Sequence, residues 1–104
     1  MKKVILSVFV VLTLVQFASA AKGVVVYKKY SCDYYIVETT MGFALLEWNG
    51  GNDPDIGHTI VGDFESYGMK TLYNLTMHAE TRAWVEDYFM SKNSVIREYY
   101  DRCR

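Results

Sequence analysis

The spacing of apolar and polar residues differs in three parts of the chain: an apolar N-terminal segment, a middle part with short apolar runs, and a C-terminal part with helical spacing. In the middle part the apolar runs are rich in valine, isoleucine, phenylalanine and tyrosine, and glycine, asparagine and aspartate separate them. This pattern is typical of short β-strands joined by turns. It predicts five strands, at residues 24–27, 34–38, 43–48, 59–61 and 69–75.

The C-terminal part of the chain has the spacing of an amphipathic helix. From Trp84 to Cys103 the apolar residues recur at steps of three and four, and charged residues occupy the opposite side. Such a stripe predicts a helix that covers a sheet with one of its faces. We expect Thr76 to cap the start of this helix, because its hydroxyl can accept a backbone hydrogen bond there. The weak helix formers within 91–94 leave open whether the helix is continuous or divided in two.

Five strands followed by a helix predict an α+β domain. Residues 36–37 and 44–46 are apolar on both faces of the hairpin expected at 34–48, so this part of the sheet should be covered on both sides. Two architectures fit this pattern. One is a small five-stranded antiparallel sheet, and the other is a partly open barrel similar to the OB fold; in both, the C-terminal amphipathic helix packs against the strands.

The N-terminal segment, residues 1–20, has the layout of a secretory signal peptide. A basic start at Met1–Lys3 is followed by an apolar run over 4–17 and by the small residues Ala18-Ser19-Ala20. We expect cleavage after Ala20, which leaves residues 21–104 as a single domain without a stable membrane anchor. An uncleaved anchor is the alternative, but the apolar run is shorter than the roughly 20 residues that a membrane span requires. The leader predicts a periplasmic or secreted protein, and its short basic form favours a bacterial over a eukaryotic source.

In an oxidising compartment, the two cysteines are expected to form a structural disulfide. One disulfide, between Cys32 and Cys103, is the intramolecular pairing open to the exported chain. Cys103 lies on the apolar stripe of the predicted helix, so its sulfur is expected to point at the sheet. Closing a loop of about 70 residues contributes about 4 kcal/mol in the chain-entropy model. Two free thiols are the alternative.

The charge of the exported chain argues against two classes of partner. Without Lys2 and Lys3, nine lysines and arginines face twelve aspartates and glutamates, which gives a net charge of −3. A chain of this charge lacks the positive field that attracts phosphate groups. We therefore expect no nucleic-acid partner and no attraction to an anionic membrane surface.

No arrangement of residues in the sequence predicts catalysis, a metal site or a cofactor. His58 and His78 are not spaced as metal ligands, and no pair of cysteines has the Cys-x-x-Cys spacing. The oxygen-rich loop at 49–55 lacks the spacing of a calcium-binding loop and its closing glutamate. No serine, threonine or cysteine is placed beside a base by any motif. We predict a protein that is not an enzyme, with no catalytic residue, metal or cofactor.

Aromatic residues are the remaining candidates for function. All nine tyrosines lie in the exported part of the chain, and tyrosine suits binding surfaces because it joins an apolar ring to a polar tip. The same property suits the rim of a small core, which is the alternative role. The candidate binding surface consists of Tyr34, Tyr35, Trp48 and Tyr73.

A short segment carries a family resemblance. Tyr30-Ser31-Cys32-Asp33, together with a cysteine near the C-terminus, resembles the frame of the periplasmic membrane-bound and C-type lysozyme inhibitors. The inhibitory segment of that family, which contains glycine and tryptophan, has no counterpart here. The long C-terminal helix also departs from an all-β barrel, so the chain is not assigned to the family.

Two functional hypotheses follow. The first is a small exported binding domain, not an enzyme, whose unknown partner is expected to be a protein. The second is an inhibitor of an extracytoplasmic enzyme such as a cell-wall hydrolase. In the second hypothesis the acidic loop at 49–55, stiffened by Pro54, enters a basic cleft.

Overall fold

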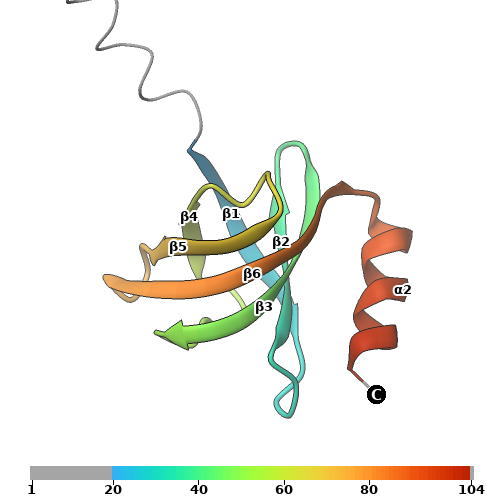
Figure 1. Cartoon of the computed structure of the whole chain (residues 1–104), viewed down its shortest axis with the longest axis horizontal. Helices are drawn as coiled ribbons and strands as arrows, with labels where there is room; N and C mark the ends of the chain where they lie inside the picture. Colours follow the sequence, from blue (N-terminus) through green and yellow to red (C-terminus); the bar gives the residue numbers. More distant parts are fainter. Residues whose placement is uncertain (1–19, 104) are drawn as a thin grey trace, which may run out of the picture.

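The computed structural model describes residues 20–103, so the predicted signal peptide, apart from Ala20, lies outside the described residues. The described part contains six strands and one helix (Figure 1). In chain order these are β1 (Ala21–Lys28), β2 (Tyr34–Thr39), β3 (Gly42–Gly51), β4 (Thr59–Gly62), β5 (Gly68–Asn74), β6 (Ala79–Met90) and α2 (Lys92–Arg102).

The six strands form a closed antiparallel barrel with the order β1-β2-β3-β6-β5-β4. Strand β1 pairs with β2 on one side and with β4 on the other, and this second pairing closes the barrel. Closure leaves no open sheet edge to pair with another chain. The predicted α+β class is therefore confirmed, in the barrel form with a C-terminal helix. The simple open sheet is excluded.

The prediction that a helix begins at Thr76 is wrong, because residues 79–90 form β6. This strand lies between β3 and β5 and pairs with both. Thr76 lies in the turn between β5 and β6, where its hydroxyl accepts a hydrogen bond from the Thr59 backbone N–H at 2.9 Å. The barrel therefore has one strand more than the sequence pattern predicted.

The helix α2 begins only after Ser91. The Ser91 hydroxyl accepts a hydrogen bond from the Ser94 backbone N–H at 3.2 Å, so Ser91 is the N-cap. The second half of the predicted helix is thus confirmed, and it ends at Arg102 beside Cys103. Figure 1 shows α2 outside the barrel, against one side of it.

Two separate hydrophobic clusters stabilise the fold. The first fills the barrel, because inward-facing positions alternate with outward-facing ones along each strand. The second lies between the outer face of the barrel and α2. The members of the first are Val25, Tyr35, Val37, Ala44, Leu46, Ile60, Phe64, Leu72, Ala83 and Val85, and those of the second are Ile36, Leu45, Met90, Val95, Tyr99 and Cys103.

Candidate functional site

An apolar groove lies between α2 and the outer face of the barrel. It has a volume of about 390 Å³ and is open to solvent. We call this feature the helix groove. Its lining residues are Val26, Tyr27, Ile36, Glu38, Phe43, Lys92, Val95, Ile96, Tyr99 and Tyr100.

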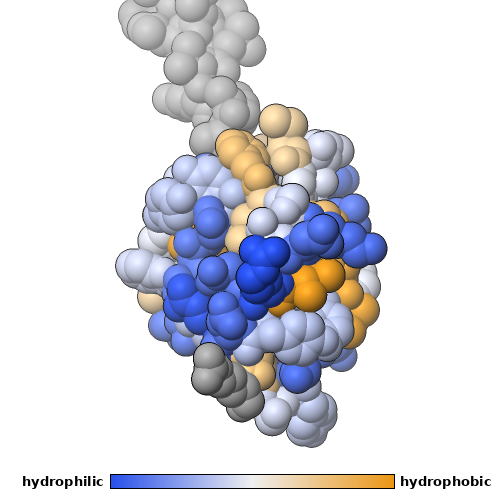
Figure 2. All heavy atoms as spheres, turned by 90° about the vertical axis from the view of Figure 1, so that its right-hand side faces the viewer, coloured by the Kyte–Doolittle hydropathy of each residue, from blue (hydrophilic) through white to orange (hydrophobic). Residues whose placement is uncertain are grey.

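Strand alternation and helix periodicity together create the two walls of the helix groove. Val25 points into the barrel, so its neighbour Val26 points outward. On the helix wall, Ile96 and Tyr100 lie four residues apart and are therefore on the same face. Both are partly exposed, at 38% and 48% of their surface. Figure 2, which views the helix side of the molecule, shows strongly hydrophobic atoms beside the polar ridge of the helix.

Polar groups also lie along the helix groove. The hydroxyls of Tyr27 and Tyr100 are 3.0 Å apart, and the ammonium of Lys29 lies 4.8 Å from the Tyr100 ring centroid. The hydrogen bond to Tyr100 raises the pKa of Tyr27 above its ordinary value. Elsewhere along the wall, Glu38 and Lys92 contribute one charge of each sign, and neither forms an ion pair among the described residues.

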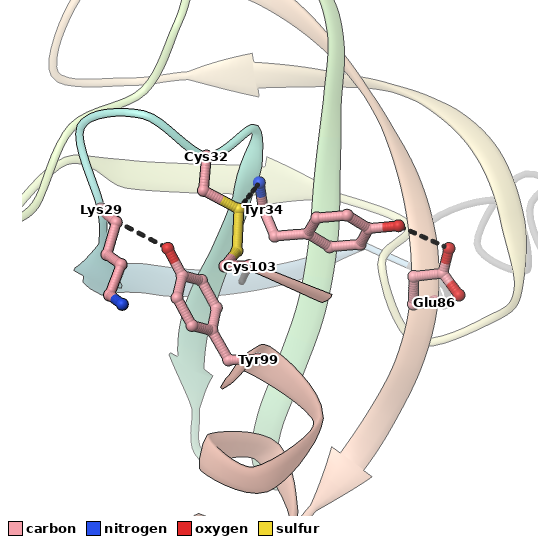
Figure 3. Close-up of a disulfide and its surroundings, with 6 residues drawn as sticks. All are labelled: Lys29, Cys32, Tyr34, Glu86, Tyr99 and Cys103. Carbon is pink, nitrogen blue, oxygen red and sulfur yellow. Dashed lines mark hydrogen bonds between the residues drawn. A yellow bond between two sulfur atoms is a disulfide. The ribbon is translucent and has the colours of Figure 1, made fainter. Parts of the chain in front are cut away.

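A disulfide fixes the helix wall to the barrel (Figure 3). Cys32, in the connection between β1 and β2, is bonded to Cys103 with a Cα–Cα distance of 5.7 Å, as the sequence predicted. One helical turn earlier, the hydroxyl of the fully buried Tyr99 accepts a hydrogen bond from the Lys29 backbone N–H at 2.7 Å. The disulfide is consistent with an oxidising, exported location. Among residues 20–103, no helix is long and apolar enough to cross a membrane.

The structure does not bring the four predicted binding residues together. Tyr35 is fully buried inside the barrel and cannot contact a partner. Trp48 packs against the same core and donates a hydrogen bond from Nε1 to the Asn52 carbonyl at 3.0 Å. Both side chains point inward because side chains alternate between the two faces of a strand. The sequence alone does not show which of these faces points into the barrel.

The other two predicted residues lie on different parts of the surface. Tyr34 is half-buried beside the disulfide, and its hydroxyl lies 3.4 Å from a carboxylate oxygen of Glu86 (Figure 3). Burial, followed by the charges of Glu47 and Glu86, raises the pKa of Tyr34. Tyr73 is exposed on β5 and pairs with Glu80 across the strands. The candidate surface is therefore not a single site.

The sequence pattern indicated some of the residues that line the helix groove. Tyr100 and Ile96 belong to the predicted apolar stripe, but a stripe does not reveal which of its members remain exposed after packing. Val26 belongs to the predicted first strand. The missing information was the contact partner of α2, because a groove needs both of its walls.

The loop between β3 and β4 is held in one conformation by contacts to the barrel. The Lys28 ammonium, on β1, binds the Asp53 carboxylate at 2.5 Å and also the Pro54 carbonyl. The Gly57 backbone N–H donates to the Val25 carbonyl at 2.8 Å, and the Asp55 N–H donates to Nδ1 of His58 at 3.0 Å. We call residues 52–58 the braced loop. Its exposed residues include Asp53, Asp55 and Ile56.

No group of three or more histidine, cysteine, aspartate or glutamate side chains within residues 20–103 is arranged to hold a metal ion. His58 is engaged in the braced loop, and His78 lies in the β5–β6 turn with a φ of 53°.

Comparison of the chain with models of protein families, with curated proteins and with solved structures finds no match. The functional argument therefore depends on the geometry described above.

Proposed function

We propose that the protein is an exported binding domain without enzymatic activity, and that the helix groove receives apolar side chains of a partner protein. The volume of the groove, about 390 Å³, lies in the range of ligand-binding sites, roughly 300–1,000 Å³. Exposed aromatic and aliphatic side chains on a rigid frame are typical of the centre of a protein interface. The single observation that carries the proposal is this open, apolar groove in a closed and disulfide-linked fold.

The predicted leader and the disulfide support the localisation that this function requires. A periplasmic or secreted domain meets partners in an oxidising environment, where disulfides form. The net charge of −3 expected after cleavage favours a protein partner over nucleic acid.

Replacing Ile96 with aspartate tests the groove as a binding site. The carboxylate would enter an apolar wall, so the affinity for the apolar dye 1-anilinonaphthalene-8-sulfonate should fall about tenfold or more. Fluorescence titration of the folded variant measures this change. The matched control is Leu75→Asp, at a similarly exposed position in the β5–β6 turn outside the groove.

The same pair of variants tests the natural partner. A protein from the exported fraction that binds the wild-type chain and the Leu75→Asp control, but not Ile96→Asp, would support the proposal. Equal dye affinity in all three proteins would contradict it.

The braced loop favours the second function, inhibition of an extracytoplasmic enzyme such as a cell-wall hydrolase. A loop held in its bound conformation loses little conformational entropy when it enters a cleft. Because Asp55 is exposed on this loop, it would face the basic residues of such a cleft.

Inhibition of a lysozyme-like hydrolase measures the second function directly. Asp55→Asn should raise the inhibition constant about tenfold, whereas Asp101→Asn, an equivalent change on the exposed side of α2, should not. No inhibition by the wild-type chain at high micromolar concentration would exclude this function for the enzyme tested.

A further inference from the structure

We propose that the Cys32–Cys103 disulfide is a redox control on the helix groove. In this proposal, reduction releases α2 while the barrel remains folded, and the groove is lost because one of its two walls has moved. The biological consequence depends on the binding function proposed above, but the structural consequence does not.

The first argument is that the barrel has its own core and its own closed set of strand pairings. The cluster inside the barrel contains no residue of α2, and the helix contacts a second cluster on the outer face. Every strand is paired on both sides without help from the helix. Loss of α2 therefore leaves the hydrogen-bonded barrel complete.

The second argument is that few contacts other than the disulfide hold α2 to the barrel, chiefly the hydrogen bond from the Lys29 N–H to Tyr99 and an ion pair between Arg102 and Glu86 at 3.3 Å. It has 11 residues, and isolated helices shorter than about 12–15 residues are marginal in water. Only Val95 and Tyr99 of this helix are buried. Both lie close in sequence to Cys103, so the covalent bond also keeps these two side chains in place.

The third argument is that the helix supplies half of the groove. Five of its lining residues come from α2, namely Lys92, Val95, Ile96, Tyr99 and Tyr100. The barrel wall alone, around Val26 and Ile36, is a convex sheet face. A binding site that needs both walls exists only while α2 is docked.

The fourth argument is that the disulfide lies beside an open polar cavity. This cavity, of about 320 Å³, is lined by both cysteines and by Lys29, Asp33, Glu47 and Arg102, among others. Cys32 is partly exposed, while Cys103 is 8% exposed. A small or protein-borne thiol can therefore approach the sulfur of Cys32 from this cavity.

The chemistry is thiol–disulfide exchange with a dithiol reductant. A thiolate of the reductant attacks Sγ of Cys32, the bond between the two protein sulfurs breaks, and Cys103 leaves as a thiolate that takes a proton from water. The second thiol of the reductant then attacks the mixed disulfide and releases Cys32. The protein gains two thiols, and the reductant becomes a disulfide.

Hydrogen exchange of the mature chain with and without dithiothreitol tests this proposal. After complete reduction, we expect the amides of α2 to lose most of their protection, while those of β3 and β6 stay protected by the remaining stability of the barrel. The double variant Cys32→Ser/Cys103→Ser should show the exchange pattern of the reduced protein, and dithiothreitol should not change it further.

Unchanged protection of α2 after complete reduction would overturn the proposal. Complete loss of protection in α2, β3 and β6 together would also overturn it, because the barrel would then not stay folded without the disulfide. Dye titration separates the two proposals. If the dye fails to bind the oxidised chain, the groove function fails, whereas release of α2 in the exchange experiment is judged independently.

Discussion

Replacing Asn74 with alanine is expected to lower the free energy of unfolding by about 3 kcal/mol. The Asn74 side chain is fully buried and makes hydrogen bonds with three partners. Its Nδ2 group donates to Oδ1 of Asn52 at 2.8 Å and to Nδ1 of His58 at 3.0 Å, and its Oδ1 accepts from the Met77 backbone N–H at 3.1 Å. Alanine removes all three contacts and leaves a buried space, so the partner groups lose their bonds within the fold.

Urea denaturation of Asn74→Ala and the wild type measures this loss, and Asn49→Ala is the matched control. Asn49 is exposed, so its replacement should change the free energy of unfolding by less than about 0.5 kcal/mol. Because Asn74 contacts two residues of the braced loop, amides in that loop should also exchange faster in the variant. If Asn74→Ala is as stable as Asn49→Ala, these hydrogen bonds do not hold the loop.

The sequence predicted the fold class, the hairpin and the disulfide because the signals for them are local or leave few alternatives. The runs at 34–38 and 43–48 lie on either side of a short turn, and the structure confirms them as β2 and β3. Gly42 in that turn has a φ of +130°, which glycine adopts without steric cost. Two cysteines allow one intramolecular pairing.

Strand β6 was missed because its sequence satisfies two periodicities at once. Thr81, Ala83 and Val85 are buried and alternate with the exposed Arg82 and Trp84, which is the period of a strand. Trp84 and Val85 also continue, at steps of three and four, the apolar stripe that belongs to α2. When a strand runs directly into a helix, the two patterns join into what looks like one long stripe.

The boundary between β6 and α2 was nevertheless marked in the sequence. Ser91 is a favoured N-cap residue, and a serine three residues later supplies the backbone N–H that the cap binds. The strand before it contains β-branched and aromatic residues, which favour strands over helices. The polar residues at 91–94 therefore mark the start of the helix. They do not divide a longer helix in two.

The helix groove could not be predicted because it depends on contacts between distant parts of the chain. Tyr27 and Tyr100 are 73 residues apart, and their hydroxyls meet because α2 packs over the outer face of β2 and β3, next to β1. Residue types indicated that tyrosines were candidates for binding, but the direction of each side chain depends on register. Tyr34 and Tyr35 show this clearly, since one residue along a strand separates a half-buried position from the barrel interior.

Tyr35→Phe is expected to stabilise the domain, and the gain should increase at high pH. The Tyr35 side chain is fully buried, and its hydroxyl has no hydrogen-bond partner among the described residues. A buried hydroxyl without a partner is destabilising, so its removal should raise the free energy of unfolding by about 1 kcal/mol at neutral pH.

The pH dependence follows from the pKa of the same hydroxyl. Burial, and secondarily the negative charge of Asp53, raise the pKa of Tyr35 in the folded protein well above its ordinary value. Below about pH 10 Tyr35 is neutral in both the folded and the unfolded chain, so it causes no pH dependence. Above that pH the unfolded chain loses this proton while the folded chain keeps it. Stability should then fall by about 1.4 kcal/mol per pH unit from this residue.

Comparing denaturation curves of Tyr35→Phe and the wild type between pH 8 and pH 11 isolates this contribution, because the other tyrosines are common to both proteins. The difference in the free energy of unfolding should be constant up to about pH 10 and widen above it. Tyr73→Phe, with its hydroxyl at the surface, controls for the loss of a tyrosine. A difference that stays constant to pH 11 would mean that water reaches the Tyr35 hydroxyl inside the barrel, because a hydrated hydroxyl ionises in the folded chain nearly as easily as in the unfolded one.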